Sequence, residues 1–463
     1  MNRLNLDVIN EIISYLCPVD ALTVSLTCKT LYELAIPVIL RDVTLEVRSR
    51  AHLNRFIIFL LEDVTRRPRL IRRLELRGER SPYRLYRPRQ HRRNDEPLNE
   101  VGLVVVLSQA CSLRSLVLDW SEDLFSNWPL SRVALAGLTS LTSVQLDDFG
   151  QAAIQTLCSL RSSPADITLS YGDTSNFRGA LLLNSPTKWT TRQFDTTQLL
   201  SNQSLLPNVN DLTWCHSKVS LDLLASAFPN VRTLELHDNR YDHRQGWWGH
   251  LDHFIGSLYD VADAISAANR PIDVRRITIK EDVLVDTGNW GMLVGIMNAC
   301  TPSVMWFPID SKNNLVVPRD FVNAGCSLRC LKVILPEYDA MSAHAFFLRL
   351  RSNMGDLPLT AFCICLERSN GKHPEIQDFD SSLPMHLAEA MPSASYIGLD
   401  ARSDEGVLHL WWRVVERDHE RYTEMIPPCF SSAVADILFA ASPKLDVKKQ
   451  TDTYLATRCK EFQ

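Results

Sequence analysis

The residues of this chain that could bind a metal ion gather in one short segment. Six histidine and aspartate residues lie around Trp247 and Trp248: His237, Asp238, Asp242, His243, His250 and His253. Zinc needs four ligands at one point, and His250 and His253 could chelate it from one helical turn. No cysteine assists them, so a polar loop explains the segment better than a metal centre. The sequence therefore predicts no metal and no other cofactor.

Residue patterns typical of catalysis do not occur in the sequence. It contains no Gly-x-Gly-x-x-Gly, no phosphate-loop lysine, no Gly-x-Ser-x-Gly and no His-Glu-x-x-His. The carboxylates Asp147 and Asp148 have no marked acid or base companion. Cys363 and Cys365 are alternate residues of an expected strand, not a redox pair. We predict that the chain is not an enzyme, and the competing hypothesis is a hydrolase with an unrecognised site in the C-terminal half.

A third feature is the arginine-rich segment between Arg66 and Arg93, with Tyr83 and Tyr86 interleaved. Guanidinium groups bind phosphate through two parallel hydrogen bonds, so the segment could serve nuclear import, RNA contact or capture of a phosphorylated target. The other interpretation is a solvated insertion, kept irregular by its prolines. These prolines are Pro68, Pro82, Pro88 and Pro97.

Composition limits the class of protein. The chain has 463 residues, of which 45% are hydrophobic and 22% charged, so it can bury a large core. Its formal net charge of -5 is too mild to imply a nucleic-acid partner. The twelve cysteines are scattered without a Cys-x-x-Cys motif, which favours free thiols in a reducing compartment.

Two observations bear on membranes. The N-terminus lacks the apolar core of a signal peptide. The longest apolar runs, 56–61 and 103–107, are far shorter than the ~20 residues that cross a bilayer. We therefore expect a soluble, intracellular protein, cytoplasmic and/or nuclear, with no membrane partner.

The elements that must position a binding surface begin at the N-terminus. One apolar stripe recurs at three- and four-residue spacing, as on an amphipathic helix: Val8, Ile9, Ile12, Ile13 and Leu16. Asn5 is a plausible N-cap of this helix. Pro18 suits the first turn of a second helix. A third helix is expected from Lys29 to Ile36, ended by Pro37.

Three helices in about 40 residues form a core too small to be stable alone. Such a unit needs a surface to pack against. Spacing alone leaves two alternatives, a partner protein or the following domain of the same chain.

The order of residues in this region resembles an F-box. The resemblance rests on four stretches and the strand after them: 4–16, 20–22, 25–29, 31–37 and 41–45. The last resembles the strand that follows the motif in many fungal F-box proteins. Asn5 replaces the proline usual in the family, and Leu40 stands where the family often has an aromatic residue.

The resemblance implies docking onto the Skp adaptor of an SCF-type (Skp–cullin–F-box) ubiquitin ligase. By family analogy, the docking residues are apolar positions of the three helices, some of which must instead form the internal core. They are Leu4, Leu6, Val8, Ile12, Leu16, Pro18, Leu22, Leu26, Cys28 and Leu31.

After the F-box-like region, a short sequence pattern repeats along the chain. An apolar residue, two polar ones and an apolar-x-apolar strand recur at 70–76, 113–119, 141–147, 209–214 and 231–237, and more weakly at 274–279, 328–333 and 394–399. Helical stretches are expected between them, at 102–110, 152–160, 221–228, 251–268, 292–299 and 343–350. One strand and one helix per unit is the leucine-rich-repeat scheme, in which stacked neighbours supply the core. The spacing varies from the low twenties to the forties, so a general α/β domain is the alternative.

We therefore predict an α/β protein: a three-helix F-box over 1–45, an irregular leucine-rich-repeat solenoid (horseshoe) over 46–400, and a C-terminal capping strand and helix segment over 401–463. A small target-binding module is the other interpretation of the last segment. If strands alternate, Leu74 and Leu76 point inward and their neighbours line an exposed concave face. Candidate target-binding residues on that face are Arg73, Glu75, Arg77, Asp119, Gln145, Asp147, Glu235, His237, Arg276 and Lys280.

The function that these features favour is substrate recognition for an SCF-type ubiquitin ligase. The F-box would bind the Skp adaptor and cullin-based core, and the repeats would bind a target protein of unknown identity. The alternative is a leucine-rich-repeat interaction scaffold that is not coupled to ubiquitination.

Overall fold

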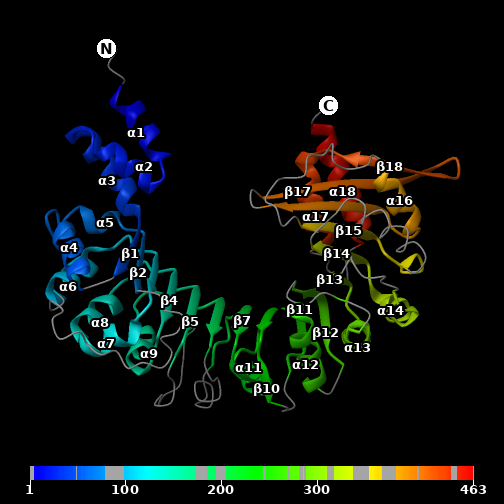
Figure 1. Cartoon of the computed structure of the whole chain (residues 1–463), viewed down its shortest axis with the longest axis horizontal. Coiled ribbons are helices and arrows are strands. Elements are labelled where there is room, and N and C mark those ends of the chain that lie inside the picture. The colour runs from blue at the N-terminus through cyan, green and yellow to red at the C-terminus, as the bar shows by residue number, and fades with distance from the viewer. Residues whose placement is uncertain are drawn as a thin grey trace. The chain divides into compact units, whose positions relative to one another are not determined.

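The computed structural model describes residues 5–47, 50–78, 99–172, 183, 185–193, 205–242, 247–268, 271–280, 285, 288–309, 317–336, 354–367, 382–403, 406–439 and 446–461. The chain divides into two compact units (Figure 1). Unit 1 comprises Met1–Val219 and Ser226–Asn230, and unit 2 comprises Ser220–Ala225 and Val231–Gln463. The predicted boundaries at residues 45 and 400 remain predictions.

Unit 1 begins with three helices, α1 (Leu6–Ser14), α2 (Pro18–Ser25) and α3 (Lys29–Arg41). The predicted N-cap is confirmed, because the Asn5 side chain accepts a hydrogen bond from the backbone N–H of Asp7 at 3.2 Å. Pro18 starts α2, also as predicted.

The predicted end of the third helix at Pro37 is wrong. Helix α3 continues through this proline to Arg41. An interior proline costs roughly 3 kcal/mol, because it removes a hydrogen bond and crowds the preceding turn. Burial of Ile36 and Leu40, 6% and 1% exposed, offsets that cost.

The rest of unit 1 combines a parallel sheet with helices. Its strands pair in sequence order: β1 (Asp42–Val47), β2 (Arg73–Gly78), β3 (Ser115–Leu118), β4 (Ser143–Asp147), β5 (Asp166–Ser170), β6 (Lys188–Arg192) and β7 (Asp211–Cys215). Its helices are α4 (Arg50–Leu61), α5 (Arg67–Leu70), α6 (Glu100–Gln109), α7 (Ser121–Asn127), α8 (Pro129–Ala136) and α9 (Gln151–Cys158). Helices α4 to α9 lie along one side of these strands (Figure 1). Strand β8 (Lys218–Ser220) and helix α11 (Leu221–Ala227) fall at the division.

Alternation along the strands separates the two faces of the unit 1 sheet. Leu74, Leu76, Leu116 and Leu118 are at most 4% exposed, as their predicted inward direction requires, although Glu75 and Val117 on the other face are also buried. The parallel register places Leu74 beside Leu116 and Leu76 beside Leu118, so apolar residues stack from strand to strand. Burial of this continuous row holds the strands to their helices.

Strand spacing in unit 1 varies over the range that the sequence predicted and is regular only from β4 to β7. Earlier register partners are 31, 42 and 28 residues apart: Asp42 and Arg73, Arg73 and Ser115, and Ser115 and Ser143. Ser143, Asp166, Lys188 and Asp211 occupy one register row, at intervals of 23, 22 and 23 residues. Strands β5 and β6 were not predicted, and their omission made one predicted interval about three times too long. The helices predicted at 102–110 and 152–160 are confirmed as α6 and α9.

A residue with positive φ also recurs directly after each of the strands β4 to β7. Asp148, Tyr171, Gln193 and His216 have φ between 52° and 56°, in the left-handed region that non-glycine residues seldom adopt. Each lies five residues after the row that begins at Ser143. The chain therefore leaves successive strands in the same way.

Unit 2 holds a second run of parallel strands and an antiparallel end. The parallel strands are β9 (Thr233–His237), β11 (His250–Gly256), β12 (Asp273–Ile279), β13 (Val304–Pro308), β14 (Cys330–Pro336), β15 (Ala361–Glu367) and β16 (Tyr396–Ser403). Strands β17 (Gly406–Arg417) and β18 (Glu420–Ile426) pair antiparallel. The helices are α12 (Leu258–Ala268), α13 (Trp290–Cys300), α14 (Arg319–Ala324), the 3-10 turn η2 (Gly325–Ser327), α16 (Leu383–Ala390), α17 (Pro428–Phe439) and α18 (Val447–Glu461). A short strand, β10, spans Arg240–Asp242.

The helix predicted over 251–268 is wrong in its first part, which forms β11. Leu251 and Phe254 are both fully buried, and they pair in parallel register with Val274 and Ile277 of β12. Helix α12 begins only after Ser257, whose hydroxyl accepts a hydrogen bond from the backbone N–H of Asp260 at 3.1 Å. Residues 221–228 and 292–299 are largely helical, as predicted, and 343–350 lies outside the described residues.

The C-terminal helices cover one face of the unit 2 sheet. They close a core of buried residues from β13 to β18 and from α17 and α18: Val304, Cys330, Ala361, Cys363, Tyr396, Trp411, Ile426, Phe430, Val434, Ala435, Leu438, Phe439, Val447 and Leu455. We call these residues the C-terminal cluster. Val304, Cys330 and Ala361 share a register row, so this is the face on which target-binding residues were predicted. The C-terminal segment thus packs as part of unit 2.

Two further observations concern the described residues. None of their helices combines the length and apolar character needed to cross a bilayer. Their cysteines are free, as predicted, and burial raises the pKa of Cys300 and Cys330 to about 12. These two thiols are therefore inert apolar packing groups.

Candidate partner-binding surfaces

Helices α1 and α2 expose an unusual number of apolar side chains. Seven large ones, between 46% and 80% exposed, are Leu6, Val8, Ile12, Tyr15, Val19, Leu22 and Leu26. We call this set the α1–α2 apolar surface. So many exposed large apolar side chains on a small unit are typical of a binding surface.

The interior of the three helices is small by comparison. Only Ile13, Ala21 and Ala35 are fully buried apolar residues of this cluster. Seven others are partly buried around them: Ile9, Leu16, Val24, Leu31, Leu34, Val38 and Ile39. Two alanines and one isoleucine give little apolar burial, at ~25 cal/mol per Å².

The structure separates the predicted Skp-docking residues into outward and inward sets. Exposed are Leu6, Val8, Ile12, Pro18, Leu22, Leu26 and Cys28, whereas Leu16 and Leu31 pack inward. Leu4 lies outside the described residues. Tyr15 and Val19 were missed, because they lie on either side of the break between α1 and α2, where helical spacing gives no guide.

Four described arginines of the arginine-rich segment have side-chain partners within the chain: Arg67, Arg69, Arg73 and Arg77. Arg67 donates to Glu62 at 2.7 Å and to the Tyr32 hydroxyl at 3.2 Å, and its guanidinium lies over the Phe59 ring. Residues 79–93 lie outside the described residues. The insertion and phosphate-binding interpretations of that part both remain predictions.

Glu75 was predicted to lie on an exposed face, and this is wrong, because it is only 3% exposed. Arg73 and Arg77 pair with its two carboxylate oxygens, the Arg77 contact being 2.7 Å. Burial alone would raise the pKa of Glu75, but the hydrogen bonds and charges of both arginines outweigh burial and lower it. These three residues satisfy one another, and the carboxylate is not available to a target.

The other unit 1 candidates also contact each other. Asp119 accepts a hydrogen bond from the backbone N–H of Gly78 at 3.0 Å, and the Gln145 amide donates to Asp147 at 3.3 Å. Burial and the nearby charge of Asp119 raise the pKa of Asp147, against hydrogen bonds from Ser170 and Gln145. This part of the face is therefore polar and weakly acidic.

In unit 2 the structure brings three candidates together. Lys280 Nζ lies 2.5 Å from Glu235 Oε1 and 3.0 Å from His237 Nε2, and His237 Nε2 lies 2.9 Å from the same glutamate oxygen. Lys280 neutralises Glu235. All three are partly buried, so this triad forms part of the surface without carrying a free charge.

Arg276, on the neighbouring part of this face, contacts an aromatic ring instead of a carboxylate. Its guanidinium carbon lies 3.8 Å from the centre of the Trp306 ring, a stacked cation–π contact. No ion pair or hydrogen bond to a carboxylate is recorded for it within the described part of the chain. Burial lowers its pKa to about 10, so it remains a cation.

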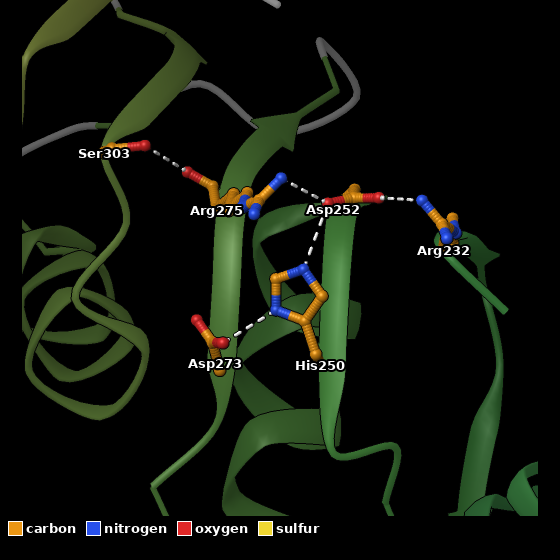
Figure 2. Close-up of polar contacts among 6 residues, drawn as sticks. All are labelled: Arg232, His250, Asp252, Asp273, Arg275 and Ser303. Carbon is orange, nitrogen blue, oxygen red and sulfur yellow. Dashed lines mark hydrogen bonds and ion pairs between the residues drawn. The ribbon is translucent and has the colours of Figure 1, made fainter. Parts of the chain in front are cut away.

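Two histidines near these residues are explained by packing. His253 Nε2 lies 2.9 Å from the Thr278 hydroxyl, and burial together with the charge of Arg276 lowers its pKa to about 3. His250 lies at the opposite face, within a charged network with Arg232, Asp252, Asp273 and Arg275 (Figure 2). Its two ring nitrogens lie 3.0 Å from Asp252 and 2.7 Å from Asp273.

Of the residues first considered as zinc ligands, His250 is engaged in this network, whereas His237 contacts Glu235 and His253 contacts Thr278. Asp252 also binds Arg275 at 2.8 Å, which leaves its oxygens engaged with cations (Figure 2). His243 is outside the described residues. Among the residues that are described, no group of three or more His, Cys, Asp or Glu side chains is arranged to hold a metal ion.

A buried ion triad lies beneath the C-terminal helices. Lys332 pairs with Asp400, and His409 Nδ1 lies 2.7 Å from the other Asp400 oxygen. Burial would raise the pKa of Asp400, but the hydrogen bond from His409 and the charge of Lys332 outweigh it and lower the pKa. Lys332 Nζ also lies 4.8 Å from the centre of the Trp306 ring.

Comparison with known proteins identifies the N-terminal helices. Residues 1–39 match the F-box domain, a stretch that ends within α3. No curated protein matches the chain. The match spans less than a tenth of the 463 residues and leaves the sheet of both units without an assigned family. The chain therefore contains an N-terminal F-box domain, which implies an SCF-type adaptor role through binding of a Skp protein.

Proposed function

We propose that this protein is the substrate-recognition adaptor of an SCF-type ubiquitin ligase, with the α1–α2 apolar surface as its Skp-binding site. The observation that carries the proposal is the exposure of Leu6, Ile12, Leu22 and Leu26 on a trio of helices with so small an interior. An F-box domain occupies these residues.

Physical chemistry favours a partner protein on this surface. Seven exposed apolar side chains at one chain end lose contact with water only if another molecule covers them. A specific interface of standard size, on the order of 1,600 Å² in total, is large enough to do so.

We further propose that the remainder is an irregular leucine-rich-repeat solenoid that holds a target protein. Three observations support this: strands paired in sequence order, a register interval of 22 or 23 residues from β4 to β7, and a left-handed residue after each of these four strands. Arrays of this kind present one extended sheet face to partners.

The proposed mechanism is positional, and the chain supplies no catalytic group. Tethering a target beside a ubiquitin thioester carried by another subunit raises the effective concentration of the target lysine. The increase in the rate of ubiquitin transfer then depends on how the target lysine is positioned. It requires two binding surfaces, one on the F-box for the Skp protein and one on the repeat region for the target.

Co-expression with a Skp protein tests the first surface. We expect a stable complex that Ile12→Asp or Leu22→Asp abolishes, because each places a charge at the centre of an apolar interface. The matched control is Ile58→Asp on α4, a residue of similar type and exposure outside the F-box (52% for Ile12, 55% for Ile58). If the folded wild-type protein shows no association, the adaptor proposal fails and an interaction scaffold uncoupled from ubiquitination takes its place.

A further inference from the structure

The open part of the unit 2 face carries one unbalanced cation. Arg276 is partly buried, stacks on Trp306 and has no recorded carboxylate partner among the described residues. Its Nε atom is buried without a hydrogen-bond acceptor in the described structure. Partial burial of a guanidinium without a counter-ion costs free energy, which a bound anion would recover.

Trp306 holds the Arg276 guanidinium beside helix α17. The Trp306 ring packs against Phe439 of α17 with ring centres 5.2 Å apart, in an edge-to-face arrangement. Arg276 lies over the same tryptophan. The guanidinium is thus held in one orientation by an aromatic plane that is itself held by the core.

Neighbouring charges on this face are already neutralised. Lys280 is paired with Glu235, and Lys332 is paired with Asp400. His253, with its pKa lowered to about 3, is neutral under physiological conditions. Among the described residues of this face, one positive charge is left over, that of Arg276.

Building on the proposed role of this face in target binding, we propose that Arg276, stacked on Trp306, receives the carboxylate of an aspartate or glutamate in an acidic segment of the target protein. The planar guanidinium matches a carboxylate through two parallel hydrogen bonds. The exposed part of the Trp306 surface would pack against the apolar stem of the same side chain or its neighbour.

The charge count favours a carboxylate over a phosphate group. A phosphorylated side chain carries nearly two negative charges at neutral pH and is usually bound by several cations. In the part of this face that the structure describes, a single cation is free, and a monoanion balances it. A phosphopeptide is the alternative that the experiment distinguishes.

The test uses the intact chain and a displayed library of short random peptides. We expect enriched peptides to share an acidic residue. Synthetic versions should lose roughly 10- to 100-fold in affinity on Arg276→Gln, or on replacement of that acid by its amide. Arg276→Lys should recover part of the loss, because it restores charge without the planar fork. Arg276→Glu should reverse the preference toward basic peptides.

Arg275→Gln is the matched control, since this arginine belongs to the same strand, β12, but its side chain is bound to Asp252. It should leave peptide binding unchanged, and thermal unfolding should show that each variant is folded. Failure to enrich any peptide, enrichment without an acidic residue, or tighter binding after phosphorylation of the peptide would each overturn the proposal. Skp association is measured separately on these variants, so a failed adaptor role is distinguishable from a failed acidic site.

Discussion

The F-box helices and the C-terminal cluster are both rich in apolar side chains. Those of the C-terminal cluster are buried within the chain, whereas many of those on the F-box helices are exposed. In the C-terminal cluster, α17 and α18 lie over the sheet, and Val434 and Leu438 are fully buried. In the F-box, Ile12 and Leu22 are more than half exposed. Helices α17 and α18 cover the C-terminal cluster, whereas no described helix covers the exposed apolar residues of α1 and α2.

This difference separates apolar residues that stabilise the fold from apolar residues that bind. Substitution in a self-covered region removes packing from the folded state and should lower the free energy of unfolding. Substitution in an uncovered region removes little packing and should affect association instead. Stability and binding measurements on matched variants can therefore challenge the comparison directly.

The largest effect is expected at the buried ion triad. Asp400→Asn leaves Lys332, whose side chain is 8% exposed, without its counter-ion, and should lower the free energy of unfolding by roughly 3–5 kcal/mol. Because the pKa of Asp400 is lowered in the folded state, the wild-type advantage is complete at neutral pH. It declines as the pH falls below the ordinary value of 3.8.

Chemical denaturation of both proteins between pH 7 and pH 3 measures this difference. Glu416→Gln, at an exposed position of β17, is the control and should change stability by no more than about 0.5 kcal/mol. Equal stability of Asp400→Asn and wild type at pH 7 would show that the triad does not hold the covered region together.

The next effect concerns packing in the C-terminal cluster. Leu438→Ala should cost roughly 2–5 kcal/mol, because the side chain is fully buried under the sheet and its removal leaves a cavity. Hydrogen exchange should accelerate in β13 to β17, the strands that α17 covers. Unchanged protection there would mean that the helix does not stabilise the sheet.

Much of the fold was predictable because local spacing determines it. The strand after Leu141 was found from its leading leucine, but β5, β6 and β13 were not, because Pro164, Pro186 and Pro302 stand in the equivalent position. These prolines are buried as the leucine is, so they fill the same place in the core. A pattern that admits proline there would have found three more strands.

The candidate sites were only partly predictable, because they depend on contacts between distant residues. Helical spacing indicated the outward Ile12 and Leu22, but it could not separate them from the inward Leu16. Alternation placed Glu75 on the open face, yet the paired Arg73 and Arg77 bury it. The covering of β13 to β17 by α17 joins residues about a hundred positions apart, as in the contact of Cys330 with Leu438. No local pattern records such a contact.

A smaller effect is expected at His253, on the part of the unit 2 face outside the C-terminal cluster. Its pKa is about 3 in the folded protein against 6.5 ordinarily, so the unfolded chain takes up a proton that the folded chain excludes. Stability from this residue is complete above pH 6.5 and declines by at most about 1.4 kcal/mol per pH unit down to pH 3. His253→Gln should remove that slope, as followed by denaturation at several pH values. A slope that is unchanged in the variant would assign the pH dependence to other groups.

The smallest effect on stability should accompany a large effect on binding. Leu22→Ala removes an apolar side chain that is half exposed, so the free energy of unfolding should change by no more than about 0.5 kcal/mol. Against a Skp protein, truncation of a central apolar contact commonly costs ~1–2 kcal/mol or more, which lowers affinity by roughly tenfold. Leu438→Ala should show the reverse order, with a large loss of stability and little change in Skp affinity for the molecules that remain folded. If Leu22→Ala instead destabilises the chain as much as Leu438→Ala does, the helices of the F-box rely on that side chain internally. The distinction between a covered and an uncovered apolar region would then not hold.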